Sequence, residues 1–155
     1  MYPIALQKIV GLFEILPEEE KRENLILYAD QSKNCAPKED EAFDLEDVRK
    51  DEECTDTVGV FINVDNQERV HLRITLGPQV QTLTKAMTSI LCKGLEGSTL
   101  QQILDIPADF VPKIVGAHLV RVRSQTVYYI LTRIKGACTA YINRQRMAEI
   151  GSRAG

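Results

Sequence analysis

Cys54 is the residue of this sequence whose type and position best suit covalent chemistry. It follows a polar, acidic stretch and precedes an apolar, β-rich run that begins at Val58. A cysteine at such a junction would be held by the strand and still be open to a partner protein. Its thiolate could then attack a sulfur atom in line and offer the product onward. A lone cysteine is nevertheless more often an inert buried residue, so both interpretations stand at this point.

The other three cysteines, Cys35, Cys92 and Cys138, add no metal site to the sequence. No two cysteines form a C-x-x-C pair, and neither histidine stands at zinc-ligand spacing from a second ligand. We therefore expect no bound metal, and thiols that stay reduced in a cytosol-like compartment. Cys92 and Cys138 are expected to be small core or surface residues of helices. Cys35 could resolve an oxidised Cys54, although only its closeness in sequence supports this.

Length and composition are those of one globular domain, residues 1–155. Of the 155 residues, 44% are hydrophobic and 26% are charged, which is ordinary usage for a chain with a buried core. No apolar run approaches the ~20 residues of a membrane span. Residues 1–16 carry charges and lack a signal-peptide cleavage site. We expect a cytoplasmic protein, or one of an organelle stroma if its source is a eukaryote, that does not bind a membrane.

Known cofactor and nucleic-acid motifs are absent from the sequence. It has no Walker loop, dinucleotide-binding glycine pattern, nucleophile elbow or H-E-x-x-H, and no basic stretch interleaved with aromatic residues. We expect neither a bound cofactor nor a nucleic-acid partner. Residues 31–53 are mainly acidic, whereas residues 113–155 are mainly basic. Such a dipolar surface could orient a partner protein, or it could be two solvated faces.

Periodic apolar residues predict the elements that would hold Cys54 in place. Helical spacing predicts helices over about residues 3–15 and 18–30, from 80 to Gly94 or Gly97, over 99–104 and 108–114, and a long one from near Arg123. Residues 58–64 and 70–76 alternate as two strands around a turn at 65–67, which predicts a hairpin. We expect residues 31–53 to form an irregular acidic connection and residues 141–155 to fray. The predicted fold class is α+β, with helices covering one face of a sheet.

Four stretches in this order resemble the SufE family of sulfur acceptors over nearly the whole chain. ALQKIVGLFEIL and EEEKRENLILYAD are similar to the family's two opening helices, and ECTDTVGVFINVDNQERVHLRI is similar to its cysteine loop and hairpin. There Cys54 takes the place of the family's cysteine and Val58 that of its valine. LTKAMTSILCKGLEGSTLQQILDIPADFV resembles the helical segment that follows. LVRVRSQTVYYILTRIK resembles the closing signature, with Arg123 at its arginine and Gln125 at its asparagine.

The resemblance implies a fold, a reaction and partners. The fold would be SufE/IscU-like, a small antiparallel sheet of about three strands covered by helices, with N-terminal helices and a long C-terminal helix. A SufS- or CsdA-like cysteine desulfurase, which uses pyridoxal phosphate, would form a persulfide, and Cys54 would accept its outer sulfur. An iron–sulfur scaffold protein would then receive that sulfur. The acceptor itself would hold no metal or cofactor, and would act as a sulfurtransferase that stimulates the desulfurase.

Asp56, Arg123 and Gln125 are the further candidate residues, for partner binding or for stabilising the thiolate. Carboxylates on both sides of Cys54, that of Asp56 among them, would raise the pKa of its thiol. A compensating cation is therefore needed, and Arg123 or a docked partner could supply it. Arg123 could equally be a solvated residue or pair with the acidic connection.

Departures from the family pattern keep two other hypotheses open. Asp56 stands where the family has Ser, Gly59 where it has Trp, and Gln125-Thr126 where it has Asn-Gly. The chain could therefore be a non-catalytic interaction or regulatory module that keeps the fold and binds through its charged surfaces. It could also be a redox sensor at Cys54, although low-pKa thiols oxidise first and the acidic neighbours disfavour a low pKa.

Overall fold

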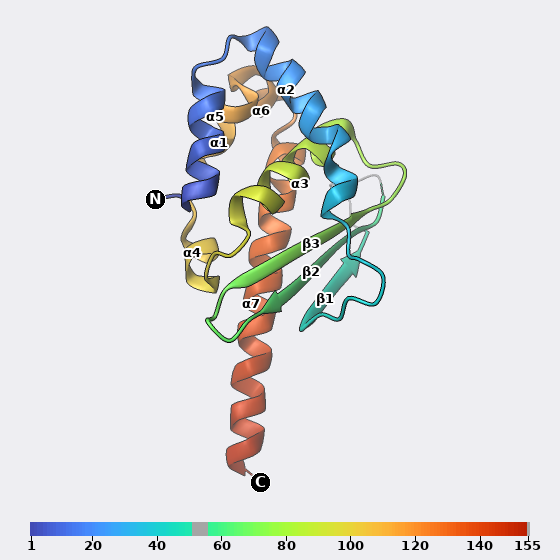
Figure 1. Cartoon of the computed structure of the whole chain (residues 1–155), viewed down its shortest axis with the longest axis vertical. Helices are drawn as coiled ribbons and strands as arrows, with labels where there is room; N and C mark the ends of the chain where they lie inside the picture. Colours follow the sequence, from blue (N-terminus) through green and yellow to red (C-terminus); the bar gives the residue numbers. More distant parts are fainter. Residues whose placement is uncertain (51–55, 155) are drawn as a thin grey trace.

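The computed structural model describes residues 1–50 and 56–154, with side chains described to residue 152 (Figure 1). Along the chain the elements are α1 (Ile4–Glu14), α2 (Glu18–Asp30), the 3-10 turn η1 (Ser32–Cys35), β1 (Leu45–Arg49), β2 (Val58–Val64), β3 (Val70–Leu76), α3 (Thr82–Leu95), α4 (Leu100–Asp105), the 3-10 turn η2 (Ala108–Phe110), α5 (Val111–Val115), α6 (Ala117–Val122) and α7 (Ser124–Ala154). This is an α+β fold with a long C-terminal helix, as the sequence predicted.

The sheet is antiparallel, with strand order β1-β2-β3. Its central strand, β2, pairs along its whole length with β3, and its first residue, Val58, also faces Arg49 of β1. Asp65 closes the β2–β3 turn, because its carboxylate accepts hydrogen bonds from the backbone N–H groups of Gln67 and Arg69 at 2.8 and 3.0 Å. The predicted hairpin and its turn are therefore confirmed.

Helices cover one face of this sheet (Figure 1). α3 packs against β3 and α7 packs against β1 and β2, while α1 and α2 pack on α3. Alternate strand residues point at these helices, as the two-residue period of a strand requires, and each is at most 1% exposed. They are Val58, Val60, Ile62, Val70, Leu72 and Ile74. The core thus lies between the sheet and the α3–α7 pair.

Three local features differ from the sequence-based predictions. The stretch expected to be irregular contains η1 and strand β1, because the polar strand residues 45–49 pair with β2 at an edge of the sheet and bury fully only Leu45. The short helix α6 was not predicted. On α2 the sequence predicts Leu25, Leu27 and Tyr28 as the buried side, but Leu27 is 58% exposed, and Ala29, one turn after Leu25, is buried instead.

The C-terminal segment also differs from its prediction, since α7 continues to Ala154 instead of fraying from residue 141. Its last turns extend beyond the rest of the molecule (Figure 1). Residues 141–154 contain no Pro and consist largely of residues with good helix propensity, so the helix that starts in the core can propagate outward. Within the described part of the chain, no helix combines the length and the apolar character needed to cross a membrane.

Candidate functional site

The connection between β1 and β2 carries the candidate cysteine. Cys54, Glu52 and Glu53 lie outside the described residues, so the site is built here from the two ends of this connection. Arg49 and Val58 are paired across the two strands, and the chain between them therefore leaves and re-enters the sheet at neighbouring points. Cys54 is four residues from Val58, which limits its distance from that strand end to about 14 Å of extended chain.

Arg133 of α7 ties these two strand ends together. Its Nη2 donates hydrogen bonds to the backbone oxygens of Asp47 at 2.8 Å and Val58 at 3.0 Å, and it also lies 3.6 Å from the Asp47 carboxylate. Its Nη1 donates to the hydroxyl oxygen of Tyr129 at 2.7 Å. The side chain is only 2% exposed, so these partners replace water at Nη1 and Nη2, whereas the buried Nε has no hydrogen-bond partner among the described residues. One buried cation therefore joins β1, β2 and α7 at the base of the cysteine connection.

Asp56 anchors the β2 end of the connection to the segment after β3. Its Oδ1 accepts a hydrogen bond from the backbone N–H of Thr57 and its Oδ2 accepts one from that of Gln79, each at 2.7 Å. These bonds, that to Gln79 first, lower the pKa of the Asp56 carboxyl below its usual value. Asp56 is therefore ionised at neutral pH and already engaged by backbone donors. This geometry gives it a role in fixing the connection, which differs from direct stabilisation of a thiolate.

Gly77 and Gly59 lie where a larger residue would overlap neighbouring side chains. A Cβ on Gly77 would overlap the carboxylate of Asp56. A Cβ on Gly59, which stands where the family has Trp, would overlap Thr75 Oγ1 and crowd Phe61 and Val48. The aromatic side chain of this outer sheet face is instead supplied by Phe61, whose ring centroid lies 5.2 Å from that of Phe43.

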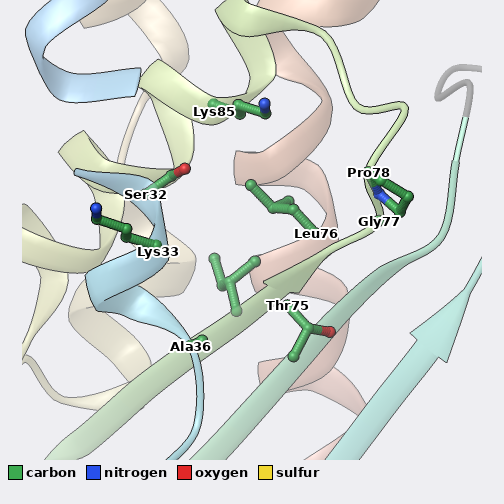
Figure 2. A pocket seen from close by; sticks show the side chains of 9 residues that line it. Ser32, Lys33, Ala36, Thr75, Leu76, Gly77, Pro78 and Lys85 are labelled. Atoms are coloured by element: carbon green, nitrogen blue, oxygen red, sulfur yellow. The ribbon is translucent and has the colours of Figure 1, made fainter. Parts of the chain in front are cut away.

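A cavity of about 410 Å³ lies beside the segment that Asp56 anchors, between η1, the end of β3 and the start of α3 (Figure 2). Gly77 and Pro78 line one part of it, and the cationic side chains of Lys33 and Lys85 line another. The cavity thus presents positive charge next to the segment that Asp56 holds. Lys85 lies in the first turns of α3, so this helix contributes one of the two cations.

Arg123 and Gln125 stand at the junction between α6 and α7. Both are exposed, and Arg123 forms no ion pair within residues 1–50 and 56–152. Arg123 and Arg22 flank an apolar cavity of about 260 Å³ whose other lining residues come from α2, α3 and α6. Among the described residues, no hydrogen bond or ion pair joins Arg123 to Asp56. Arg123 lines the cavity between α2, α3 and α6, whereas Asp56 binds the backbone N–H groups of Thr57 and Gln79. Their roles towards Cys54 stay predictions.

The remaining cysteines are all buried. Burial raises the pKa of the Cys138 thiol to about 11, which makes it inert at neutral pH. Cys35 of η1 and Cys92 of α3 hydrogen bond to each other, and the bond from Cys92 lowers the pKa of the Cys35 thiol to about 7. Cys35 therefore has a thiol partner in the core, on α3, besides its closeness to Cys54 in sequence.

Arg133 and the Cys35–Cys92 pair were missed by sequence reasoning. Arg133 lies among apolar residues of a helix, where the spacing Tyr129, Ile130, Arg133, Ile134 already places it on the buried side. That spacing was the available signal, because a buried arginine must find several acceptors. The thiol pair had no such signal, since 57 residues separate Cys35 from Cys92 (92 − 35).

Comparison with known proteins and families shows what this chain is similar to. A protein of Thermus thermophilus, described as a hypothetical protein with a solution structure, shares 23% sequence identity and superimposes with a TM-score of 0.67, covering 92% of this chain and 99% of that one. It shows that the fold has been seen before. No curated protein matches the chain significantly. The model of the SufE family, the Fe-S metabolism associated domain, matches residues 7–138. This chain therefore belongs to the SufE family.

Proposed function

We propose that this protein is a cysteine-desulfurase accessory protein that accepts persulfide sulfur on Cys54 and delivers it to iron–sulfur cluster assembly. The observation that carries the proposal is the family match over residues 7–138, which includes Cys54 and associates the chain with iron–sulfur metabolism. The proposed partners are a pyridoxal-phosphate-dependent cysteine desulfurase and an iron–sulfur scaffold protein, and the proposed location is the cytoplasm.

The transfer needs no oxidant or reductant. The desulfurase cysteine arrives as a persulfide, and the Cys54 thiolate attacks its outer sulfur in line. A new S–S bond forms at Cys54 while the donor's S–S bond breaks, and the donor cysteine leaves as a thiolate. The outer sulfur keeps its proton and its oxidation state. A thiolate of the next acceptor then repeats the same exchange on the Cys54 persulfide.

The two ends of the cysteine connection support this role. Sulfur exchange between two proteins requires an accessible thiol on a backbone that is held in place. The attacking sulfur, the transferred sulfur and the leaving sulfur must lie in line, and misalignment of these three atoms slows the attack. Arg133 holds the backbone oxygens of Asp47 and Val58 at the two strand ends. Asp56 accepts hydrogen bonds from the N–H groups of Thr57 and Gln79 at the β2 end. The anchored residues Asp47, Asp56 and Val58 lie within seven residues of Cys54 along the chain, so these contacts restrict where its thiol can be presented.

Mass spectrometry tests the proposal directly. The protein is mixed with a desulfurase, cysteine and pyridoxal phosphate, and the peptide that contains Cys54 should gain about 32 Da, the mass of one sulfur, in a form that a thiol removes. Cys54→Ser should lose this adduct and the stimulation of the desulfurase. Cys138→Ala changes a buried thiol and serves as the matched control, which should keep both. A persulfidated desulfurase beside an unmodified Cys54 would exclude the proposal.

A second candidate function is a non-catalytic interaction module on the same fold. The outer face of β2 favours it, because Gly59 replaces the family's Trp and has no room for a side chain. In that case the protein would bind a desulfurase equally well with Cys54→Ala and would not increase its turnover. Binding and turnover measured on the same pair of proteins separate the two functions.

A further inference from the structure

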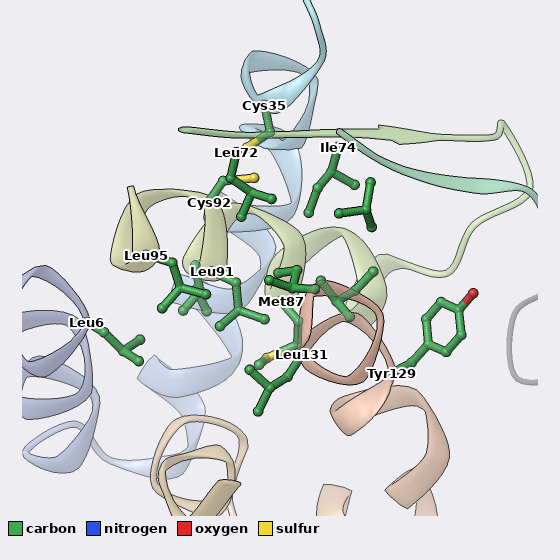
Figure 3. Packing of buried hydrophobic residues seen from close by; sticks show 14 of the residues in the cluster. Leu6, Cys35, Leu72, Ile74, Met87, Leu91, Cys92, Leu95, Tyr129 and Leu131 are labelled. Atoms are coloured by element: carbon green, nitrogen blue, oxygen red, sulfur yellow. The ribbon is translucent and has the colours of Figure 1, made fainter. Parts of the chain in front are cut away.

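Cys35 and Cys92 bring two thiols together from distant parts of the chain. η1, which carries Cys35, packs against α3, which carries Cys92, and also against β3. Figure 3 shows both sulfur atoms on the same side of α3, beside Leu72, and the two thiols hydrogen bond to each other. Each residue is less than a tenth exposed, at 7% and 8%. The contact is therefore part of the folded core.

The surroundings make the two thiols unequal. The hydrogen bond from Cys92 is the main cause that lowers the pKa of Cys35, with further help from Ser89, Lys93 and Arg73. The pKa of Cys92 is raised well above the usual value, by that bond first and then by burial. These opposite shifts make Cys35 the more acidic thiol of the pair and leave Cys92 as the proton donor to it.

Charged groups on the neighbouring elements also affect the pKa values of the two thiols. Lys93 belongs to α3, where its ammonium lies over the ring of Tyr28 and donates a hydrogen bond to Gln31. Arg73 of β3 pairs with Glu41 at 3.5 Å. Glu96 at the end of α3 acts in the opposite sense, raising the pKa of Cys92. Two cations therefore favour the Cys35 thiolate, whereas the Glu96 carboxylate raises the pKa of Cys92.

We propose that Cys35 and Cys92 form a redox-active dithiol, a modification site separate from Cys54, that closes reversibly into an intramolecular disulfide in the presence of a small thiol oxidant. A nucleophilic thiolate with an adjacent protonated thiol is the arrangement that favours disulfide closure over further oxidation of one sulfur. The site does not depend on sulfur acceptance by Cys54.

The chemistry balances with a diazene or a peroxide as the oxidant. With a diazene, the Cys35 thiolate adds to the N=N bond and one nitrogen takes up a proton. The Cys92 sulfur then displaces the hydrazine from Cys35, forming the S–S bond, and its proton goes to the leaving nitrogen. Two thiols are oxidised and one diazene is reduced to a hydrazine. With hydrogen peroxide, the Cys35 thiolate attacks one oxygen, the O–O bond breaks and hydroxide leaves, so Cys35 becomes a sulfenic acid. Cys92 then displaces water from it, forming the S–S bond.

The experiment uses the full chain with Cys54→Ser, so that Cys35, Cys92 and Cys138 are the remaining thiols. Diamide, a diazene, is added at pH 7.5, free thiols are blocked with N-ethylmaleimide after unfolding, and the mass is measured. We expect one blocked thiol, a loss of about 2 Da for the two hydrogens removed, and a peptide that links Cys35 to Cys92. Dithiothreitol should restore three blocked thiols.

Matched variants test the specificity of the closure. Cys138→Ala should leave the disulfide unchanged, whereas Cys35→Ser and Cys92→Ala should each abolish it. The same oxidation in 8 M urea should give a mixture of pairings, because the unfolded chain does not hold the two thiols together. If the folded protein keeps three free thiols, links Cys138, or forms dimers between chains, the proposal is wrong. The mass change and the linked peptide are measured on the protein that keeps both Cys35 and Cys92. They therefore do not require the Cys92 variant to fold.

Discussion

The guanidinium of Arg133 donates a hydrogen bond to the backbone oxygen of Val58 at 3.0 Å, at the point where the chain enters β2 after the cysteine connection. The same nitrogen reaches the backbone oxygen of Asp47 on β1. A helix residue from the last fifth of the chain therefore sets the spacing between the two strand ends that flank Cys54. The first two predictions concern the anchors of this connection.

Replacing Arg133 with Met should destabilise the protein by about 2–4 kcal/mol. The substitution removes the side-chain donor of the backbone oxygens of Asp47 and Val58 in a buried place, and unpaired buried polar groups cost about 1–3 kcal/mol each when not rehydrated. Urea unfolding followed by circular dichroism measures the change. Arg144→Met, at an exposed arginine of the same helix, is the control and should stay within about 0.5 kcal/mol.

A double-mutant cycle tests the close fit between Gly77 and Asp56. Gly77→Ala should destabilise the wild-type protein by about 1 kcal/mol, because the new Cβ displaces the Asp56 carboxylate from its backbone donors. In the Asp56→Ala background the overlap is gone. There the same change should be neutral or stabilising, since Ala lowers the entropy of the unfolded chain and φ of Gly77 is not positive. Equal effects of Gly77→Ala in both backgrounds would contradict the contact.

Reversing the charge at Arg123 should weaken the response of a desulfurase without affecting folding. Arg123 is exposed and flanks the apolar cavity that it shares with Arg22, so it is available to an acidic partner surface. With Arg123→Glu, the protein concentration that gives half-maximal stimulation should rise about tenfold, equivalent to about 1.4 kcal/mol. Arg121→Glu makes the same charge change at an exposed residue of α6. If both variants behave alike, the effect belongs to net charge and not to Arg123.

His71 should make stability decrease as the pH rises above about 6.5. Its Nδ1 lies 2.6 Å from Glu96 and its Nε2 2.8 Å from Asp65, and these two carboxylates, Glu96 first, raise its pKa. A raised pKa in the folded state means that the contribution is complete below the unfolded value of about 6.5 and is lost as pH rises through the folded pKa.

The measurement for His71 is urea unfolding between pH 5.5 and 9 with wild type and His71→Gln. The stability difference between the two proteins should shrink with rising pH. Cys35 titrates in part of the same range with the opposite sign, but it is common to both proteins and cancels in the difference. His118→Gln, at an exposed histidine of α6, should leave the wild-type curve unchanged. A difference that is constant with pH would show that the carboxylates do not hold a proton on His71.

Local patterns in the sequence were enough for most elements. The bounds of α2 and of both hairpin strands were predicted to the residue, because apolar periodicity, Pro17 and the Asp65 turn are all encoded within short segments. Strand β1 was missed, since its stability comes from pairing with β2 and not from its own polar residues. Leu27 was wrongly placed in the core because the apolar stripe of α2 is too weak to fix its phase.

The sequence by itself determined the α+β class and the SufE family, because order and spacing of motifs along the chain carry both. It also named Cys54, Asp56, Arg123 and Gln125 as candidates, whose roles stay predictions. Tertiary structure alone decided that Asp56 binds the backbone of Gln79, that Arg133 joins two strand ends, and that Cys35 contacts Cys92. The physical reason is the same in each case. Such contacts join residues far apart in the chain, and no local pattern specifies which distant surfaces will close over a buried charge or thiol.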